Sequence, residues 1–289
     1  MKEIQLIKLY CTVCQHYYTI ISRDVQRLSN NFCPKFSDEE CITIYLWGIA
    51  NRKFEAKESY KFIKDYWSEW FPKLPSYQNF NRRICNLAEV FVQMAGLMLS
   101  ECEMSSDIFT YLIDSLPIVV ANSKRSSSAK VAREICDKGY CASKGMYYYG
   151  LKLHSLNQKQ PYTLPKLFMA WVTPASVSDL TSAKQELLNT RNIDVYGDKI
   201  YNDATWFREM KDKYNVSITA PVKMKKGQTR LNSADKIYNS LVSSIRQPLE
   251  SFFNWLQQRT NIQSASKVRS TNGLIAFVFA RLALSFSLF

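Results

Sequence analysis

The order of strand-like and helix-like segments after residue 106 is the feature that most limits how this chain can fold. Three segments rich in β-forming residues come first: 108–114, 146–156 and 166–173. Helix-type and strand-type segments then alternate: 179–190, 193–198, 203–214, 216–222 and about 247–258. Three strands followed by this alternation predict an α/β domain with a mixed five-stranded sheet flanked by helices.

The residues before 106 carry helix signals instead. Ser37 and Glu40 have the spacing of a capping box ahead of an apolar run, and Ser76 stands where it would cap a later helix. We therefore predict two domains, a helical domain over residues 1–105 and an α/β domain over residues 106–289.

Two of the predicted helices, over about 55–70 and 77–101, have the layout of a helix-turn-helix. The second begins with polar side chains that can bond to base edges and phosphates, and an ordinary helical hairpin with a polar face is the alternative. The side chains in question are Gln78, Asn79, Asn81, Arg82 and Arg83. This helical domain is accordingly predicted to bind DNA ends.

Positive charge is concentrated in two parts of the chain. The net charge of +13 comes from residues 121–160, with eight Lys and Arg against two Asp and Glu, and residues 201–270, with twelve against five. Concentrated basic charge favours a polyanionic partner, nucleic acid first, and solvated basic loops without a partner are the alternative. The side chains expected to hold DNA phosphates are Lys124, Arg125, Lys130, Arg133, Lys223, Lys225, Lys226 and Arg230.

Neither end of the chain predicts a membrane segment. The first residues lack the basic-then-apolar layout of a secretory signal. The run 273–289 is strongly apolar, but it contains Arg281 and is short for a membrane span, so we predict a buried terminal helix. We therefore expect a cytoplasmic protein.

The eight cysteines, all before residue 142, leave two interpretations. A zinc site is conceivable, although two of its candidate ligands fall in a helical pattern and the other two lack finger spacing. Reduced thiols are the default expectation for a cytosolic protein. The candidate zinc ligands are Cys11, Cys14, Cys33 and Cys41.

Three acidic residues fall where the predicted sheet would bring them together. Asp114 ends the first strand, Asp198 ends the fourth, and Glu250 lies in the late helix. Three carboxylates facing one cleft would repel one another and raise their own pKa values unless cations occupied the site. Two magnesium ions are the natural occupants, and they would activate the attacking oxygen and stabilise the leaving oxygen in phosphoryl transfer.

Residues 107–289 resemble the DDE transposases of bacterial insertion sequences, a superfamily with a ribonuclease-H-like fold. The segment "LIDSLPI" resembles the family's first-aspartate strand and "YYGLKLHSL" its second strand. "VYGDKIYND" is similar to its second-aspartate segment, and "IRQPLESFFNWLQ" to its late-helix signature. The resemblance assigns the catalytic, metal-binding roles to Asp114, Asp198 and Glu250, and a DNA contact to Arg246.

The chain departs from the family's pattern at three positions. The signature's lysine is Gln257 here, the tyrosine expected three residues before Arg246 is Ser243, and the glycine of the second-aspartate segment is Ile200. The first two departures put a DNA contact near the cleavage point in doubt, not the binding of metal. Pro248 is expected in a helix's first turn, which would place Glu250 near the helix start.

Several other polar and aromatic residues have competing interpretations. His154 could touch the scissile phosphate or lie buried with a partner, and Asp203 is best interpreted as a helix cap. Asp194 is expected to face solvent. Stacking on bases is conceivable for some aromatic residues, with core packing as the alternative. Asp179 is a further rival acid, and the aromatic candidates are Trp206, Tyr201 and Tyr140.

The resemblance implies an enzyme that cuts DNA at the ends of an insertion sequence and joins the freed 3′-hydroxyl to target DNA. It implies Mg²⁺ or Mn²⁺, two ions per active site, with double-stranded DNA as partner. A homodimer on the DNA and a place at the bacterial nucleoid are also expected from the family. The rivals are a nuclease of the same fold and a decayed transposase that only binds DNA.

Overall fold

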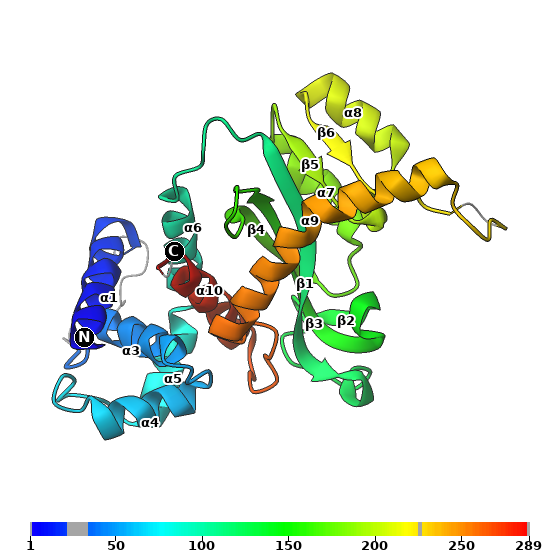
Figure 1. The fold of residues 1–289 in the computed structure, drawn as a ribbon. Helices are drawn as coiled ribbons and strands as arrows, with labels where there is room; N and C mark the ends of the chain where they lie inside the picture. The colour runs from blue at the N-terminus through cyan, green and yellow to red at the C-terminus, as the bar shows by residue number, and fades with distance from the viewer. Residues whose placement is uncertain (1, 22–33, 225–226, 288–289) are drawn as a thin grey trace. The chain divides into compact units, whose positions relative to one another are not determined.

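The computed structural model describes residues 2–21, 34–224 and 227–287, without the side chains of residues 20, 21 and 287. The chain divides into two compact units (Figure 1). The helical unit comprises Met1–Cys102, Lys130–Glu134 and Leu256–Phe289, and the sheet unit comprises Glu103–Ala129 and Ile135–Trp255. The division differs from a boundary at residue 105 mainly in the C-terminal segment, which packs within the helical unit.

The helical unit is built from helices that bury an apolar face. α10 packs against α6, α5 and α3, and their apolar residues form its core. The helices are α1 Lys2–His16, a π-helical turn Tyr17–Ile21, α3 Asp38–Ala50, α4 Ala56–Tyr66, α5 Tyr77–Asn86, α6 Ala88–Ser100 and α10 Thr271–Ser287. The last confirms the prediction of a buried terminal helix; none of the described helices is long and apolar enough to cross a membrane.

Arg281 explains how a charged residue fits in the apolar α10. Its side chain is fully buried, and its guanidinium donates hydrogen bonds to the backbone carbonyls of Thr260 and Phe54 and to the Tyr45 hydroxyl. It also lies over the Phe277 ring, 3.4 Å from the ring centroid. Burial lowers the pKa of Arg281, and these acceptors offset the cost of removing the charge from water.

The predicted helix caps in this unit are confirmed, but one helix boundary was missed. Ser37 Oγ accepts from the Glu40 amide while the Glu40 carboxylate accepts from the Ser37 amide, and Ser76 caps α5. The helix predicted over 77–101 is interrupted at Leu87, which separates α5 from α6. Its apolar spacing continues across the break because both helices bury the same kind of face, so the pattern could not reveal it.

The α4–α5 pair differs from the predicted helix-turn-helix. Residues 67–76 separate the two helices, a connection longer than the turn of about 3–4 residues typical of that motif. Trp67 in this connection packs edge-on against Trp47 of α3, with ring centroids 5.6 Å apart. The connection is therefore an anchored segment rather than a tight turn.

The sheet unit contains six strands in five positions. β3 pairs antiparallel with β1 on one side; on its other side β2 takes residues 146–150 and β4 takes residues 151–158. β5 pairs in parallel with β1, and β6 in parallel with β5. The strands are β1 Thr110–Asn122, β2 Asp137–Cys141, β3 Met146–Gln158, β4 Lys166–Pro174, β5 Asp194–Tyr196 and β6 Ser217–Thr219. This mixed α/β sheet with flanking helices confirms the predicted ribonuclease-H-like fold class.

β2 lies in a segment for which the sequence predicted no strand. Its Asp and Gly content disfavours a strand in isolation. Gly139 is buried in it, and a Cβ there would lie 2.2 Å from the Ala175 carbonyl oxygen, so the strand needs glycine for this close approach. The tertiary contact, not local preference, fixes the strand.

Three helices complete the sheet unit: α7 Asp179–Glu186, α8 Ala204–Tyr214 and α9, which begins at Ser233 and ends at Thr260. α7 and α8 share a core with the strands that includes Ile113 and Trp206. α9 crosses the sheet in front of β1 in the view of Figure 1. Its position brings a long helix against the strand that carries the first candidate acid.

α9 contradicts the expected start of the late helix. Pro248 lies well inside it, so Glu250 is not near a helix N-terminus and gains nothing from amide dipoles there. Proline in a helix interior costs about 3 kcal/mol. The helix continues because Val242 before the proline and Leu249 and Phe252 after it are all buried.

Candidate active site

The strand register brings two of the predicted acids to equivalent positions. The parallel pairing of β1 with β5 ends at the pair Leu112–Tyr196, and Asp114 and Asp198 each lie two residues beyond it. Asp114 is therefore inside β1 and not at its end as predicted, because β1 continues along β3 to Asn122. Asp198 follows β5 and caps a short 3-10 turn.

Arg246 joins the two aspartates. One guanidinium nitrogen of Arg246 lies 2.8 Å from Asp114 Oδ2, and another lies 3.6 Å from Asp198 Oδ1. The arginine side chain is 12% exposed, against 29% for Asp114 and 43% for Asp198. A half-buried pair of carboxylates thus has one built-in cation.

The electrostatics of this group centre on Asp114. Burial raises the pKa of Asp114 to about 6, although the Arg246 charge and the Ser115 amide, whose nitrogen lies 2.8 Å from Asp114 Oδ1, act in the opposite direction. The negative charges of Asp198 and Asp179 add to the increase. A carboxyl group with these neighbours is stabilised by any cation placed against it.

A buried tyrosine lies beside the acids. Tyr201 is fully buried, its hydroxyl has no hydrogen-bond partner among the described residues, and burial and the Asp114 charge raise its pKa. A Cβ at Gly197 would lie 2.7 Å from the Tyr201 ring, so only glycine allows the ring to pack beside Asp198. Gly197 therefore has a packing role.

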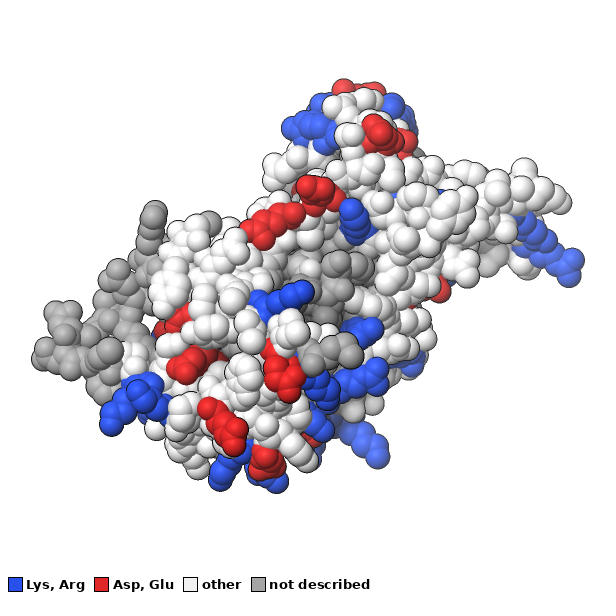
Figure 2. Space-filling view, turned by 60° about the vertical axis from the view of Figure 1, so that its left-hand side comes forward, with Lys and Arg blue, Asp and Glu red and all other residues white. Residues whose placement is uncertain are grey.

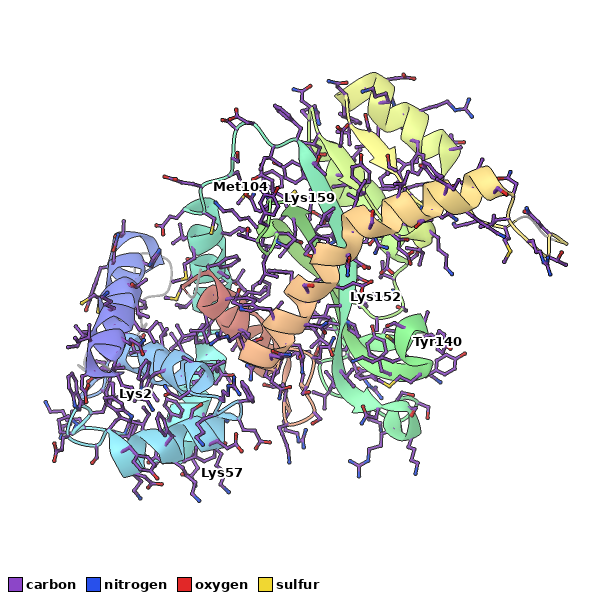
Figure 3. The ribbon with its side chains drawn as sticks, viewed as in Figure 1. Lys2, Lys57, Met104, Tyr140, Lys152 and Lys159 are labelled. Atoms are coloured by element: carbon purple, nitrogen blue, oxygen red, sulfur yellow. The ribbon has the colours of Figure 1, made fainter. Side chains whose placement is uncertain are left out.

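A third acid, Asp179, is near this group. Lys152, which extends from β3 (Figure 3), donates to Asp179 Oδ1 over 3.0 Å, and His154 Nδ1 lies 3.9 Å from the same oxygen. His154 is fully buried, is 2.8 Å from Thr173 Oγ1 through Nε2, and stacks on Trp171. The buried interpretation of His154 is the one the structure supports. The contact of Lys152 with Asp179 was not predicted, because the sequence of a strand does not show that a lysine in it is paired with an acid.

A comparison with protein families shows which family the chain belongs to. The model of the family described as "Transposase DDE domain" matches residues 105–270, more than half of the chain. The chain belongs to this family. No curated protein matches the chain. Membership implies a DNA-processing enzyme that works with divalent metal ions.

The donor set of the transposase fits a divalent cation at Asp114 and Asp198. Carboxylate oxygens are the ligands that Mg²⁺ prefers, and the Arg246 guanidinium already places positive charge between them. Arg246 Nε, like the Tyr201 hydroxyl, is buried without a partner among the described residues. Within the described ranges, no three His, Cys, Asp or Glu side chains are grouped to hold an ion, and the described cysteines are not joined in disulfides.

Glu250, the third predicted acid, is not brought to the two aspartates by any hydrogen bond or ion pair among the described residues. It is exposed on α9, one turn beyond Arg246 on the same helix. Its catalytic role stays a prediction. Arg246 itself, predicted to contact DNA, points at the aspartates in this structure.

Most of the predicted phosphate contacts are exposed, as such contacts require. Arg83 differs, because its guanidinium is paired with the buried Asp38, and we therefore do not retain it as a DNA contact. On the face shown in Figure 2, Lys and Arg side chains form separate groups with Asp and Glu between them. Exposed are Arg82, Lys124, Arg125, Lys130, Arg133, Lys223 and Arg230, whereas Lys225 and Lys226 lie outside the described residues.

The remaining predicted acids and aromatics are mostly structural. Asp203 Oδ1 accepts from the Thr205 and Trp206 amides, which confirms the helix cap, and Asp194 is exposed as expected. Trp206 and Tyr201 are core residues. Tyr140 on β2 (Figure 3) is half-exposed beside Tyr147, with ring centroids 4.9 Å apart.

Gln257, at the signature's lysine position, bonds to two residues that follow it in the chain. Its Nε2 donates to Asn261 Oδ1 over 2.8 Å, and its Oε1 accepts from the Gln263 amide over 3.0 Å. Asn261 has a positive φ of 53° and lies just past the end of α9. Gln257 therefore holds the segment that leaves the helix, a role that a lysine cannot fill in the same way.

Proposed function

We propose that this transposase cuts phosphodiester bonds at the ends of an insertion sequence and joins the freed 3′-hydroxyl to target DNA. The observation that carries the proposal is the Asp114–Arg246–Asp198 group, in which two strand-positioned carboxylates share one cation. Asp114, Asp198 and Glu250 are the residues that would hold two divalent ions. Mg²⁺ or Mn²⁺ bound there would supply positive charge to activate the attacking oxygen and stabilise the leaving one.

The chain's own residues position the substrate and control charge. Without DNA, the single positive charge of Arg246 offsets part of the negative charge of the aspartate pair. When a DNA phosphate arrives, the guanidinium can turn to it, since arginine binds phosphate through the same fork of donors. Both carboxylates are then free to hold cations beside the bond to be cut.

We include in the proposal a homodimer on the DNA, because two ends have to be cut together. Near its start, α9 has exposed apolar side chains at Ile237, Tyr238 and Leu241, with 64%, 41% and 59% of their surfaces accessible. Ile237 and Leu241 are four residues apart and share a helix face. This row is where a contact with a second copy is best tested.

A second candidate is a decayed transposase that binds DNA without cutting it. Ser243 and Gln257 favour it, because neither supplies the DNA contact that the family's signature places there. The two candidates differ only in catalysis, so a joining assay separates them.

The experiment uses pre-cut element ends, a supercoiled target plasmid and Mg²⁺. We expect the native chain to join ends to the target, and Glu250→Gln to reduce joining on the order of a hundredfold or more. Glu209→Gln, a matched change at another exposed glutamate of the sheet unit, should join like the native chain. Cutting without joining in the native chain would indicate a nuclease, and DNA binding without either reaction would indicate the decayed transposase.

A further inference from the structure

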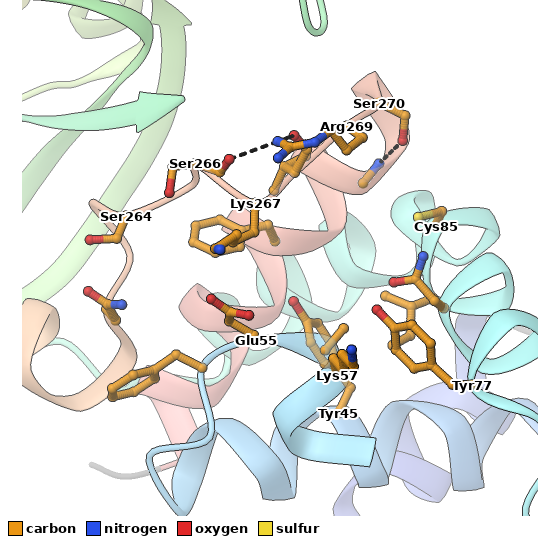
Figure 4. A pocket seen from close by; sticks show the side chains of 18 residues that line it. Tyr45, Glu55, Lys57, Tyr77, Cys85, Ser264, Ser266, Lys267, Arg269 and Ser270 are labelled. Atoms are coloured by element: carbon orange, nitrogen blue, oxygen red, sulfur yellow. Dashed lines mark hydrogen bonds between the residues drawn. The ribbon is translucent and has the colours of Figure 1, made fainter. Parts of the chain in front are cut away.

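A pocket in the helical unit is lined by positively charged side chains. Its volume is about 360 Å³, and its walls come from the starts of α4 and α5, the 261–270 loop and the start of α10. Lys57, Lys267 and Arg269 line it, against the single carboxylate of Glu55. Figure 4 shows Lys57 on α4 and Lys267 on the loop, on two sides of the opening. The pocket has an excess of positive charge, and it brings Lys57 of α4 together with Lys267 and Arg269 of the basic segment 201–270.

The two lysines are not paired with anything that would neutralise them. Among the described residues, neither Lys57 nor Lys267 makes a hydrogen bond or an ion pair, and both are exposed. One guanidinium nitrogen of Arg269 donates to the Ser266 and Val268 carbonyls, each at 2.8 Å. Its other N–H groups can donate to a ligand. Free ammonium groups around one concave surface attract an anion.

Neutral donors complete the lining. Ser264, Ser266, Ser270 and Asn81 also line the pocket, and the Ser270 hydroxyl already accepts a hydrogen bond from the Gly273 amide. Three helices begin at its wall, and the first amides of a helix carry partial positive charge. Hydroxyl, amide and ammonium donors together are the groups that proteins use against phosphate oxygens.

The loop that presents the cations is held in place. Ile262 and Ala265 are fully buried, and the Val268 amide donates to the Ala265 carbonyl over 3.1 Å. Gln257 fixes its beginning through Asn261 and the Gln263 amide. The backbone that carries Lys267 and Arg269 is therefore ordered before a ligand arrives, which lowers the entropy cost of binding.

We propose that this pocket binds backbone phosphates of double-stranded DNA, as a contact separate from the Asp114–Asp198 site. The proposal rests on DNA being the substrate, as in the proposed function, but not on cleavage. Phosphate contacts position a duplex without reading its sequence. The pocket thus serves element ends and unrelated duplexes alike.

The test is duplex binding by the full-length chain without metal, followed by fluorescence anisotropy at several salt concentrations. Lys57→Gln/Lys267→Gln removes two cations without touching the loop's bonds to Arg269. We expect affinity to fall on the order of tenfold, and the slope of log affinity against log salt to fall by about 0.9 per lost contact, or about 1.8 in all. An element end and a scrambled duplex should be affected equally.

Two matched variants keep the result interpretable. Lys61→Gln/Lys64→Gln removes two exposed charges of α4 that do not line the pocket, and it should change the slope less. Lys57→Arg/Lys267→Arg keeps both charges and should bind like the native chain. An unchanged slope in the pocket variant, or an equal loss in the Lys61/Lys64 control, overturns the proposal.

Free phosphate compounds are the other source of the same chemistry. Calorimetric titration with inorganic phosphate and with a nucleoside monophosphate covers this arm. Binding that the pocket variant abolishes, together with unchanged duplex binding, would show a small-molecule site and overturn the proposal. If the native chain binds no duplex at all, the proposed function fails with it; if it binds and cuts but the pocket variant behaves like native, only the pocket proposal fails.

Discussion

The Asp114–Arg246–Asp198 group and the Lys57–Lys267 pocket handle charge in opposite ways. The first group carries its own counter-charge, since the Arg246 guanidinium lies against both carboxylates. The second presents ammonium groups that have no partner among the described residues. The first is partly withdrawn from water, and its charges are costly unless neutralised, whereas the second is exposed and solvated.

The difference indicates how each region meets a ligand. A solvated basic pocket can attract DNA from a distance with no rearrangement, at the cost of sensitivity to salt. A carboxylate pair that already contacts an arginine has to exchange one cation for another before it can hold metal ions. Binding and chemistry are therefore expected to respond to different variables, salt for the pocket and metal for the acids.

The largest predicted effect on stability comes from removing the Arg246 charge that lies against both aspartates. Arg246→Gln leaves Asp114 and Asp198 facing each other without a cation, and we expect the free energy of unfolding to fall by about 2–4 kcal/mol in metal-free buffer. Mg²⁺ should stabilise this variant more than the native chain, because the arginine no longer competes for the carboxylates. Thermal unfolding with and without Mg²⁺ measures both effects.

The control for that experiment is Arg208→Gln, a change at an exposed arginine of the sheet unit whose guanidinium donates to the Ala204 carbonyl. It should unfold like the native chain in both buffers. Equal Mg²⁺ stabilisation of native and Arg246→Gln proteins would contradict the idea that arginine stands where a metal ion binds.

A smaller effect concerns pH, which should change the stability of the folded chain through His154 but not duplex binding by the pocket. Burial lowers the pKa of His154 from 6.5 to about 4, so between these values the unfolded chain binds a proton there that the folded chain does not. Stability is therefore lost as the pH falls through this window, by up to about 3 kcal/mol. Urea unfolding at pH 7 and pH 4.5 should show a larger loss in the native chain than in His154→Gln.

The raised pKa of Asp114 acts in the opposite sense, but it is present in both of these proteins and cancels in their difference. Duplex binding through the pocket should not follow His154, because no titrating histidine lines it. A native chain and a His154→Gln variant with the same pH dependence of unfolding would show that His154 is not held neutral.

The smallest predicted effect concerns the loop that presents Lys267. Gln257→Lys restores the signature's lysine but removes the bonds to Asn261 and Gln263, at a cost of about 1 kcal/mol in unfolding free energy. Gln258→Lys, at the exposed neighbouring position, should cost less. An undiminished stability with faster DNA cleavage would indicate instead that the signature's DNA contact is simply missing here.

Local signals in the sequence predicted much of this structure. The caps at Ser37, Ser76 and Asp203 were predictable because each is fixed by neighbours within three residues. The alternation of strand-type and helix-type segments after residue 106 predicted the α/β fold class, because each segment carries its own pattern of residues. Asp114 and Asp198 were expected to lie together because both were predicted to end strands; they do lie together, although Asp114 is inside β1, because the parallel pairing of β1 with β5 stops two residues before each of them.

Features set by tertiary packing could not be predicted in this way. The start of α9 was misplaced because Pro248 suggests a first turn, whereas burial on both sides carries the helix through it. β2 depends on the contact of Gly139 with Ala175. Pairings between distant residues, such as Arg83 with Asp38 and Arg246 with Asp114, leave no trace in local spacing.

The most direct test of the central claim is cleavage of a supercoiled plasmid that carries the element's own ends, with Mg²⁺ or Mn²⁺, by the native chain and by Asp198→Asn. We predict metal-dependent cutting that falls on the order of a thousandfold or more in the variant, with DNA binding retained. Equal cutting by both proteins, or equal binding with no cutting by either, would contradict the assignment of Asp198 to a metal-dependent active site.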